Sequence, residues 1–279
     1  MDYFAGLDIG STMTKVVIMA QEVVISLVRV TKPEQRKLAY LLMREALRGS
    51  GLSFDELTYI VATGYGRINV PFADRQVTEI SCHARGVSYL VPGVRTIIDI
   101  GGQDCKGIKV VGGRVVGFVM NDKCAAGTGR FLELTAGALG VEVEEIGELA
   151  LTSGNPVEIS STCTVFAQQE VVTKLAEGVA LNDILAGLHQ AIAARIFSLV
   201  SRLRIEPEVV ITGGGAKNVG LVKALEEKLG FPAVLPADPL LTGALGAALL
   251  GRDLVEKARK EGALPTKRER RLEEVRFFA

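Results

Sequence analysis

The chain has 279 residues with 32 basic and 32 acidic side chains, and its formal net charge is +0. This balance excludes the broad basic field typical of nucleic-acid-binding proteins. A hydrophobic content of 48% excludes a disordered chain. The length allows two domains, or one large domain with a substantial core. No apolar run is expected to span a membrane, because the best candidate, residues 240–250, is short and contains Gly243 and Gly246.

The first half of the chain predicts a repeated α/β unit. The expected elements are a hairpin over 4–18, a helix over 33–48, a strand over 59–63, a helix over 78–90 and a second hairpin over 96–110. Asp8 and Asp99 occupy matching Asp-Ile-Gly contexts, each followed by a small-residue tip and a lysine. This repetition indicates an internal duplication.

The second half is expected to be mainly helical. The pattern predicts a third strand over 115–119, helices over 131–139, 143–151, 164–177 and 181–204, a strand over 208–212, a helix over 221–229, a short strand over 231–236 and a helix over 242–260. We expect domain I over 1–93, with the helix near 242–260 packing back on it, domain II over 94–241, and a charged tail over 261–279. From Lys257 the tail favours a solvated helix, with partner docking as the alternative.

Three strand-end loops carry the glycines and small hydroxyl residues that let backbone N–H groups approach phosphate oxygens. The candidate nucleotide ligands are Gly10, Ser11, Thr12, Thr14 and Lys15; Gly101, Gly102 and Gln103; and Gly213, Gly214, Gly215, Ala216 and Asn218. Asp8 and Asp99 are candidate Mg²⁺ ligands, because Mg²⁺ prefers oxygen donors. For any single loop, an ordinary tight turn is the alternative.

The loops lack the spacing of a P-loop or of a Rossmann fingerprint. Their pattern resembles the actin, sugar-kinase and heat-shock ATPase superfamily. The resemblance implies an α/β protein with two duplicated ribonuclease-H-like domains around a nucleotide cleft. It also implies that Asp8 and Asp99 serve the metal, and that Gln103 and Asp104 orient or activate the attacking water.

Four cysteines are too few for a disulfide scaffold and favour metal or redox use in a reducing compartment. Cys124 precedes the glycine-rich turn Gly127-Thr128-Gly129, and Cys163 also leads into a helix. A helix start offers free N–H groups and a positive dipole end to thiolates. Four thiolates usually hold a [4Fe–4S] cluster, so two cysteines per chain would require a two-fold dimer.

Two alternatives stay open for the cysteines. Cys82 and Cys105 could complete a cluster within one chain, or all four cysteines could be structural. We interpret Cys82 and Cys105 as small packing residues. The only histidines, His83 and His189, do not occur in a ligand spacing.

Several segments together resemble the ATP-dependent activators of 2-hydroxyacyl-CoA dehydratases and the related benzoyl-CoA reductase ATPase subunits. These segments are Asp8 to Thr12, Ala62 to Arg67, Asp99 to Asp104, Asn121 to Phe131 and Ser160 to Ala167. The match runs from Gly6 to about Leu250. It implies a homodimer that hydrolyses ATP, holds one [4Fe–4S] cluster through Cys124 and Cys163 of each subunit, and donates one electron. A cytoplasmic location is expected because no basic-then-apolar leader follows Met1.

The same resemblance implies the partners. The acceptor would be an iron–sulfur dehydratase or reductase, and the electron source a ferredoxin or flavodoxin; neither nucleic acid nor a membrane is expected. The turn Gly127-Thr128-Gly129 is a candidate for sensing the nucleotide and so linking ATP to the cluster. Two competing hypotheses are a small-molecule kinase of the sugar-kinase type and a non-redox ATP-dependent reactivase.

Overall fold

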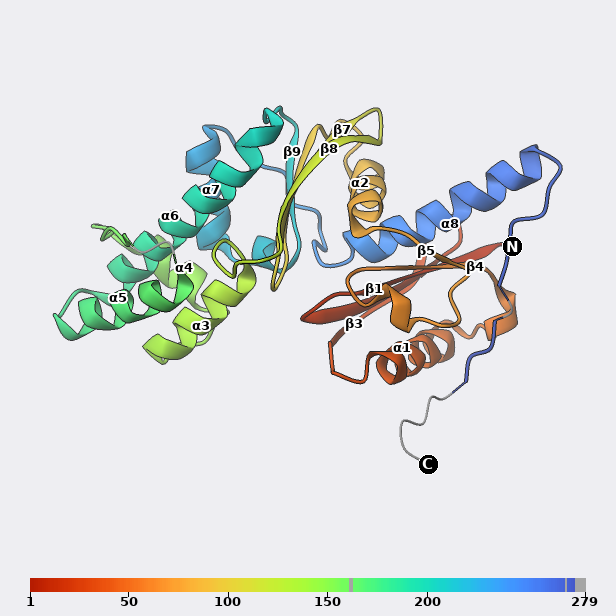
Figure 1. Cartoon of the computed structure of the whole chain (residues 1–279), viewed down its shortest axis with the longest axis horizontal. Helices are drawn as coiled ribbons and strands as arrows, with labels where there is room; N and C mark the ends of the chain where they lie inside the picture. The colour runs from red at the N-terminus through yellow and green to blue at the C-terminus, as the bar shows by residue number, and fades with distance from the viewer. Residues whose placement is uncertain (161–162, 269, 274–279) are drawn as a thin grey trace. The chain divides into compact units, whose positions relative to one another are not determined.

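The computed structural model describes residues 1–160, 163–268 and 270–273, and the chain forms two compact units (Figure 1). Unit 1 contains Met1–Pro92, Gly112–Val115 and Leu240–Ala279, and unit 2 contains Gly93–Val111 and Val116–Pro239. Each unit is built on one β-sheet with its own hydrophobic core.

The sheet of unit 1 has the order β3-β2-β1-β4-β5. Its strands are β1 (Tyr3–Ile9), β2 (Met13–Met19), β3 (Val23–Val30), β4 (Leu57–Thr63) and β5 (Arg75–Gln76). The first three strands form an antiparallel meander, whereas β4 and β5 add in parallel. The predicted hairpin over 4–18 corresponds to β1 and β2. Strand β3 was not predicted, although its sequence is rich in β-branched residues.

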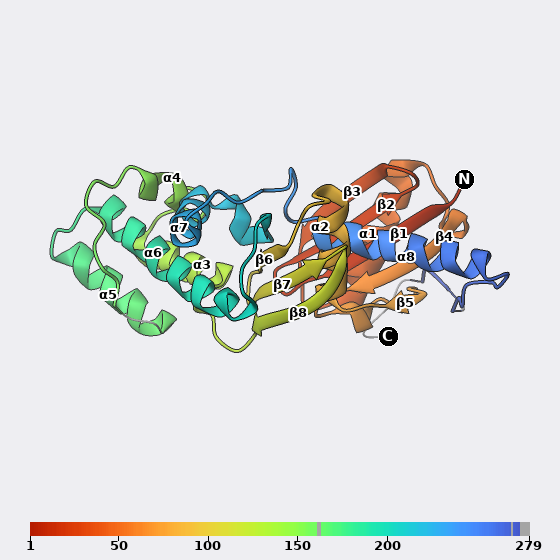
Figure 2. The same cartoon turned by 90° about the horizontal axis from the view of Figure 1, so that it is seen from above.

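Helices cover both faces of this sheet. Helix α1 (Gln35–Ser50) packs on β1, β2 and β3, while α8 (Thr242–Lys260) lies across β1 and β4 and contacts α2 (Glu79–Leu90) (Figure 2). The two helices α2 and α8 meet at backbone distance, because a Cβ atom on Gly246 would lie 1.7 Å from the Cys82 carbonyl oxygen. Gly246 therefore permits the close packing of α8 on α2.

The sheet of unit 2 has the order β8-β7-β6-β9. Its strands are β6 (Thr96–Ile100), β7 (Cys105–Val111), β8 (Arg114–Asn121) and β9 (Val209–Thr212). As in unit 1, the first strand of the hairpin pairs antiparallel with the second and parallel with a later strand. The place of β5 is taken by an isolated parallel bridge between Val210 and Val234. The predicted strand over 231–236 is therefore reduced to this bridge.

In the described part of unit 2, the sheet is accompanied by the helices α3 (Gly129–Leu139), α4 (Ile146–Leu151), α5 (Thr164–Ala176), α6 (Leu181–Val200) and α7 (Val219–Leu229). Helix α4 begins three residues later than predicted. Together with the 3₁₀ turn Ser201–Leu203, α6 is long and apolar enough to cross a membrane, contrary to the sequence expectation. Its apolar side chains, including Ile184, Leu188 and Ile192, belong to the core of unit 2, which identifies it as a core helix.

The tail is not helical beyond α8 in the part that the structure describes, so the predicted solvated helix is wrong there. Instead it lies on unit 1. Arg270 donates to the carboxylate of Asp74 at 3.3 Å and to the Leu57 carbonyl oxygen at 2.8 Å. Its guanidinium also lies 5.6 Å from the ring centroid of Phe54. The tail is thus held on unit 1 by its contact with buried Asp74, which the local sequence of the tail does not indicate.

The matching strand orders confirm the predicted architecture. Both sheets begin with an antiparallel hairpin whose first strand carries an aspartate, and in both a parallel strand pairs with that first strand. The fold is a duplicated ribonuclease-H-like α/β fold of the actin, sugar-kinase and heat-shock ATPase type.

Candidate nucleotide and cysteine sites

The first candidate loop joins β1 and β2 in unit 1. Asp8, at the end of β1, lies opposite Lys15 in the hairpin register. The Lys15 ammonium is 2.9 Å from Asp8 Oδ2, and Asp8 is only 4% exposed. Gly10 closes the tip by donating its N–H to the Met13 carbonyl oxygen at 3.1 Å. The sheet therefore fixes a carboxylate and an ammonium together beneath a glycine turn.

Unit 2 repeats this arrangement with one addition. Asp99 lies opposite Lys106 in the register of β6 and β7, and the Lys106 ammonium is 3.2 Å from Asp99 Oδ2. The same ammonium is 2.8 Å from Asp104 Oδ2. Gly101 closes this tip by donating to the Asp104 carbonyl oxygen at 2.9 Å. The predicted candidates Asp99, Asp104 and Gly101 thus come together around one buried lysine.

The duplication extends to the glycines after β4 and β9. Gly64 has φ +84° and Gly213 has φ +82°. A Cβ atom on Gly64 would lie 2.4 Å from Asp8 Oδ1, and one on Gly213 would lie 2.7 Å from Asp99 Oδ1. Each aspartate is therefore covered by bare backbone in a left-handed conformation that favours glycine. Gly64 was not among the predicted site residues, although it belongs to the motif Ala62 to Arg67.

The other predicted nucleotide ligands differ in how accessible they are. Ser11, Gln103 and Gly214 are exposed, and Thr12, Gly101 and Gly102 are partly so. Thr14 is fully buried, and its hydroxyl pairs with that of Thr31 at 2.8 Å. Gly215 and Ala216 are also buried, and both lie within the 3₁₀ turn Gly214–Lys217. These buried residues contribute to the packing of the loops.

Asn218 has a structural task that its loop position did not predict. Its Oδ1 accepts the Leu221 N–H at 2.9 Å and so caps the N-terminus of α7. The same oxygen lies 2.9 Å from Nε2 of His189, whose Nδ1 contacts the Leu185 carbonyl oxygen at 2.6 Å. Burial lowers the pKa of His189 from its ordinary value. In unit 2, His189 thus joins α6 to the cap of α7.

The start of α8 contributes to the surroundings of Asp8. A Cβ atom on Gly243 would lie 3.0 Å from Asp8 Oδ2 and 3.2 Å from Nε2 of His83. Nδ1 of His83 is 3.0 Å from the hydroxyl of Thr242, the first residue of the helix. The positive end of a helix favours a nearby carboxylate. Sequence analysis missed this contribution, because Gly243 follows Asp8 by more than 200 residues.

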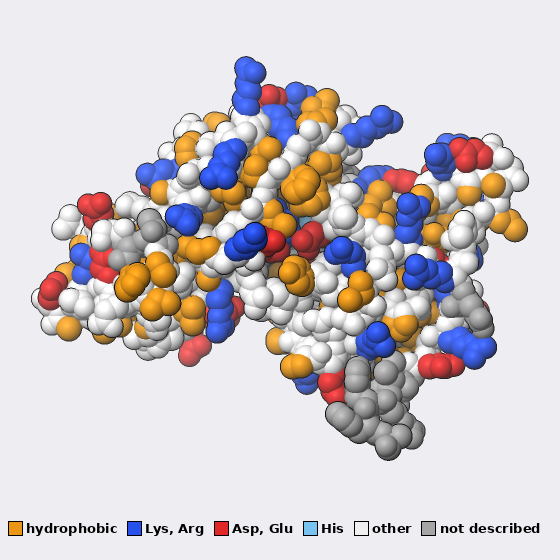
Figure 3. Space-filling view, viewed as in Figure 1, with side chains coloured by type: hydrophobic (Ala, Val, Ile, Leu, Met, Phe, Trp, Pro, Cys, Tyr) orange, Lys and Arg blue, Asp and Glu red, His pale blue; other side chains and the backbone are white. Residues whose placement is uncertain are grey.

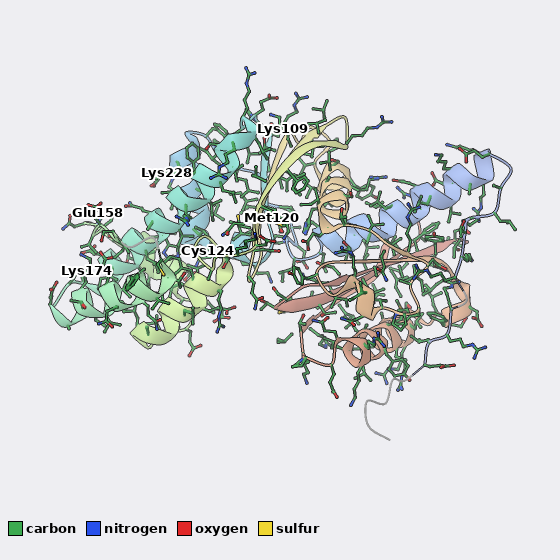
Figure 4. All side chains as sticks on the ribbon, viewed as in Figure 1. Lys109, Met120, Cys124, Glu158, Lys174 and Lys228 are labelled. Carbon is green, nitrogen blue, oxygen red and sulfur yellow. The ribbon has the colours of Figure 1, made fainter. Side chains whose placement is uncertain are left out.

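Cys124 lies in the loop between β8 and α3, and Figure 4 labels it together with Met120 of β8. Asn121 holds this loop by donating from its side-chain amide to the carbonyl oxygens of Cys124 (2.8 Å) and Ala126 (3.0 Å). The Thr128 hydroxyl donates to the Ala125 carbonyl oxygen at 2.7 Å. Cys124 is partly exposed and packs against the core of unit 2.

The N-terminus of α3 does not offer its first N–H groups to Cys124. Gly129 N–H donates to the Gly101 carbonyl oxygen at 2.9 Å, and Arg130 N–H donates to the Gly102 carbonyl oxygen at 2.8 Å. The expectation that these N–H groups are free for Cys124 is therefore wrong, because the tip of the β6–β7 hairpin occupies both donors. What the structure shows instead is a main-chain connection between the cysteine loop and the tip of the β6–β7 hairpin.

Cys163 does stand at a helix start. It is the N-cap residue of α5 and is exposed, and its neighbours Ser161 and Thr162 lie outside the described residues. Val165 and Phe166, in the first turn of α5, are 69% and 68% exposed. Hydrophobic side chains gather over this part of unit 2 in the space-filling view (Figure 3). An exposed thiol thus lies beside an exposed apolar pair.

The remaining two cysteines are buried. Burial raises the pKa of Cys82 to about 12 and also raises that of Cys105. Metal binding requires the thiolate form, which such burial disfavours. Within the described part of the chain, no group of three or more His, Cys, Asp or Glu side chains is placed to hold a metal ion.

The fold and the paired aspartate hairpins define an ATPase of the ribonuclease-H-like superfamily. The sequence profile of the BadF/BadG/BcrA/BcrD ATPase family matches residues 5–251, and the chain belongs to this family. This confirms the resemblance drawn from the motifs.

Individual relatives agree with this assignment. The 2-hydroxyisocaproyl-CoA dehydratase activator of Clostridioides difficile is 46% identical over 268 residues, covering 93% of this chain and 98% of the relative. A structure of that activator with bound ADPNP superposes with a TM-score of 0.86, at 44% identity over 93% of this chain and 97% of that one. The structure of a component of the (R)-2-hydroxyglutaryl-CoA dehydratase of Acidaminococcus fermentans gives a TM-score of 0.88 at 42% identity, covering 91% and 98%. A polypeptide of the benzoyl-CoA reductase of Thauera aromatica is 33% identical over 275 residues, covering 94% and 97%.

Proposed function

We propose that this ATPase is a one-electron donor that activates an iron–sulfur acyl-CoA dehydratase or reductase. The observation that carries the proposal is the pair of accessible cysteines in unit 2, in a chain whose relatives are named dehydratase activators. In this proposal a ferredoxin or flavodoxin supplies the electron, and the unpaired thiols suit the reducing cytoplasm.

The donor set of one chain fits half of an iron–sulfur site. Cys124 and Cys163 are the two cysteines that reach the surface, whereas Cys82 and Cys105 are buried. A [4Fe–4S] cluster normally takes four thiolates, so Cys124 and Cys163 of two subunits would hold it. When bound, the cluster supplies a single low-potential electron. Val165 and Phe166 beside Cys163 give a second copy of the chain an apolar surface to cover.

The two hairpins fit the nucleotide and its metal. Asp8, Asp99 and Asp104 supply the carboxylate oxygens that Mg²⁺ prefers. The tips around Gly10 and Gly101 expose backbone that phosphate oxygens can approach. Gly214 is exposed in the loop after β9, where a nucleoside would approach the backbone, and Gln103 is exposed for contact with water.

The main-chain hydrogen bonds from Gly129 to Gly101 and from Arg130 to Gly102 support a link between the nucleotide and the cysteine loop. A shift of the β6–β7 tip when the terminal phosphate leaves would pull directly on the first turn of α3. The loop that holds Cys124 enters this turn through Thr128. ATP hydrolysis would thereby change the surroundings of the Cys124 thiolate.

The test is an iron determination on protein purified without oxygen. We expect about two irons per chain, which is one four-iron cluster for two subunits. Cys124→Ser and Cys163→Ser should each lose the iron and the associated absorption. Cys82→Ser is the matched control and should keep both, because this buried thiol packs between α2 and α8.

Other outcomes would contradict the proposal in distinct ways. Four irons per chain would refute the shared cluster while preserving a redox role. A colourless protein that phosphorylates a small molecule would favour the kinase hypothesis. A colourless protein that consumes ATP only with a partner enzyme would favour the non-redox reactivase.

A further inference from the structure

We propose that the two duplicated hairpins have divided their tasks, and that Lys106 is a positioning residue that holds Asp104 for ATP hydrolysis, whereas Lys15 contacts the nucleotide phosphates. The inference deepens the ATP-hydrolysing part of the proposed function. It does not depend on the iron–sulfur cluster.

The two hairpins align residue by residue through their strand registers. Asp8 pairs with Lys15 across β1 and β2, and Asp99 pairs with Lys106 across β6 and β7, and the partners are seven positions apart in both cases. This alignment places Met13 where the second hairpin has Asp104. The second hairpin therefore has one carboxylate more than the first.

This extra carboxylate changes the position of the lysine. The Lys106 ammonium lies 2.8 Å from Asp104 Oδ2 and 3.2 Å from Asp99 Oδ2, and its side chain is 3% exposed. The Lys15 side chain is 12% exposed and forms its ion pair with Asp8 alone among the described residues. A buried lysine between two carboxylates cannot turn to a phosphate without giving up both of these ion pairs, which is costly in a buried site.

Asp104 is held from a second side by the hairpin tip. A Cβ atom on Gly101 would lie 2.3 Å from Asp104 Oδ1, so this oxygen rests against the bare α-carbon. Lys106 fixes Oδ2, and the Gly101 N–H binds the Asp104 carbonyl oxygen. The carboxylate is thus fixed in one orientation, with its side chain still 18% exposed to solvent.

A fixed carboxylate at this position suits the proton transfer in hydrolysis. When water attacks the terminal phosphorus, a new O–P bond forms, the bond to the β-phosphate oxygen of ADP breaks, and a proton leaves the water. Asp104 can orient the water and accept this proton. A general base contributes about 10²–10⁴-fold to the rate when it is correctly placed, so its positioning residue should affect kcat.

The test compares Lys106→Met with the matched variant Lys15→Met in steady-state ATPase assays. Lys106→Met should lower kcat at least about tenfold with little change in KM for ATP, because it disturbs the transition state. Lys15→Met should mainly raise KM and weaken ADP binding in calorimetry, with and without Mg²⁺. A purely structural lysine would not give this split.

A double variant shows whether Lys106 acts through Asp104. If it does, Lys106→Met combined with Asp104→Asn should be no slower than Asp104→Asn alone, because the two residues act as a unit. The double variant leaves one carboxylate fewer facing the missing ammonium, so it should be less destabilised than Lys106→Met. Multiplicative losses in kcat, or a raised KM in Lys106→Met, would overturn the inference. An iron-free protein that shows the expected kcat and KM pattern would refute the proposed electron transfer and support this inference.

Discussion

Replacing Arg270 with methionine should strongly destabilise unit 1, although Arg270 lies near the C-terminus. The Asp74 side chain is 0% exposed and the Arg270 side chain 12%, so the change leaves a buried carboxylate without its cation. Breaking a buried ion pair in this way costs about 3–5 kcal/mol. The Ile60 N–H still donates to Asp74 Oδ2 at 2.8 Å in this variant. The expected loss in the free energy of unfolding is therefore at the lower end of this range, about 3 kcal/mol.

The assay is denaturant unfolding of the full chain at several pH values. Desolvation raises the pKa of Asp74 above its ordinary 3.8, outweighing the Ile60 N–H and Arg270. A carboxyl group with a raised pKa in the folded state favours folding below its unfolded pKa, and this contribution is lost as pH rises through the folded pKa. The deficit of Arg270→Met should therefore be largest near pH 7 and shrink as pH falls towards 4. Asp74→Asn should recover much of the loss at pH 7.

The control is Arg271→Met at the neighbouring position. Arg271 and Glu273 form a long surface ion pair of 3.9 Å with both side chains more than two-thirds exposed. Such pairs contribute about 0–1 kcal/mol, so this variant should unfold close to the native protein. Equal effects of the two substitutions at pH 7, or a deficit of Arg270→Met that does not change with pH, would refute the role of Asp74 as the anchor of the tail.

Two glycine substitutions test the loops of unit 2, each against a glycine that meets no neighbour. Gly213→Ala should cost about 3 kcal/mol and abolish ADP binding, because its Cβ atom would lie 2.5 Å from the Ile100 carbonyl oxygen as well as adopting φ +82°. Gly230→Ala, at φ +80° in open space, should cost only about 1 kcal/mol and keep ADP binding in calorimetry. Gly129→Val should uncouple ATP hydrolysis from electron delivery, because its side chain would press on Gly101 and Gly102; Gly137→Val, in the same helix, should stay coupled. Intact coupling in Gly129→Val, measured as electrons delivered per ATP, would contradict the proposed link.

Periodicity and repetition were sufficient for the framework. The bounds of α8 were predicted to the residue, and the repeated Asp-Ile-Gly motif led to the pairing of two sheets of the same order. Strand β3 was missed although its run is apolar and β-branched, because it carries no motif of its own beside the hairpin that precedes it. The tail was assigned as helix from its charges, whereas Asp74, about 200 residues earlier, decides its conformation.

The roles of individual side chains were harder to predict, because they depend on neighbours that are distant in the sequence. Asn218 follows a glycine loop, yet its oxygen caps α7 and contacts His189. Lys106 and Lys15 stand in equivalent sequence positions, and only the position of Asp104 distinguishes them. Local motifs thus identify the loops, while tertiary contacts decide which side chains within them are available.

The connection between the cysteine loop and the tip of the β6–β7 hairpin consists of main-chain hydrogen bonds, from Gly129 to Gly101 and from Arg130 to Gly102. No side-chain substitution removes these donors and acceptors, apart from proline at the donor positions. Relatives can therefore exchange many residues around both loops and retain the same mechanical connection. The surface of such a protein could then adapt to a new partner enzyme while the connection between these two loops stays the same.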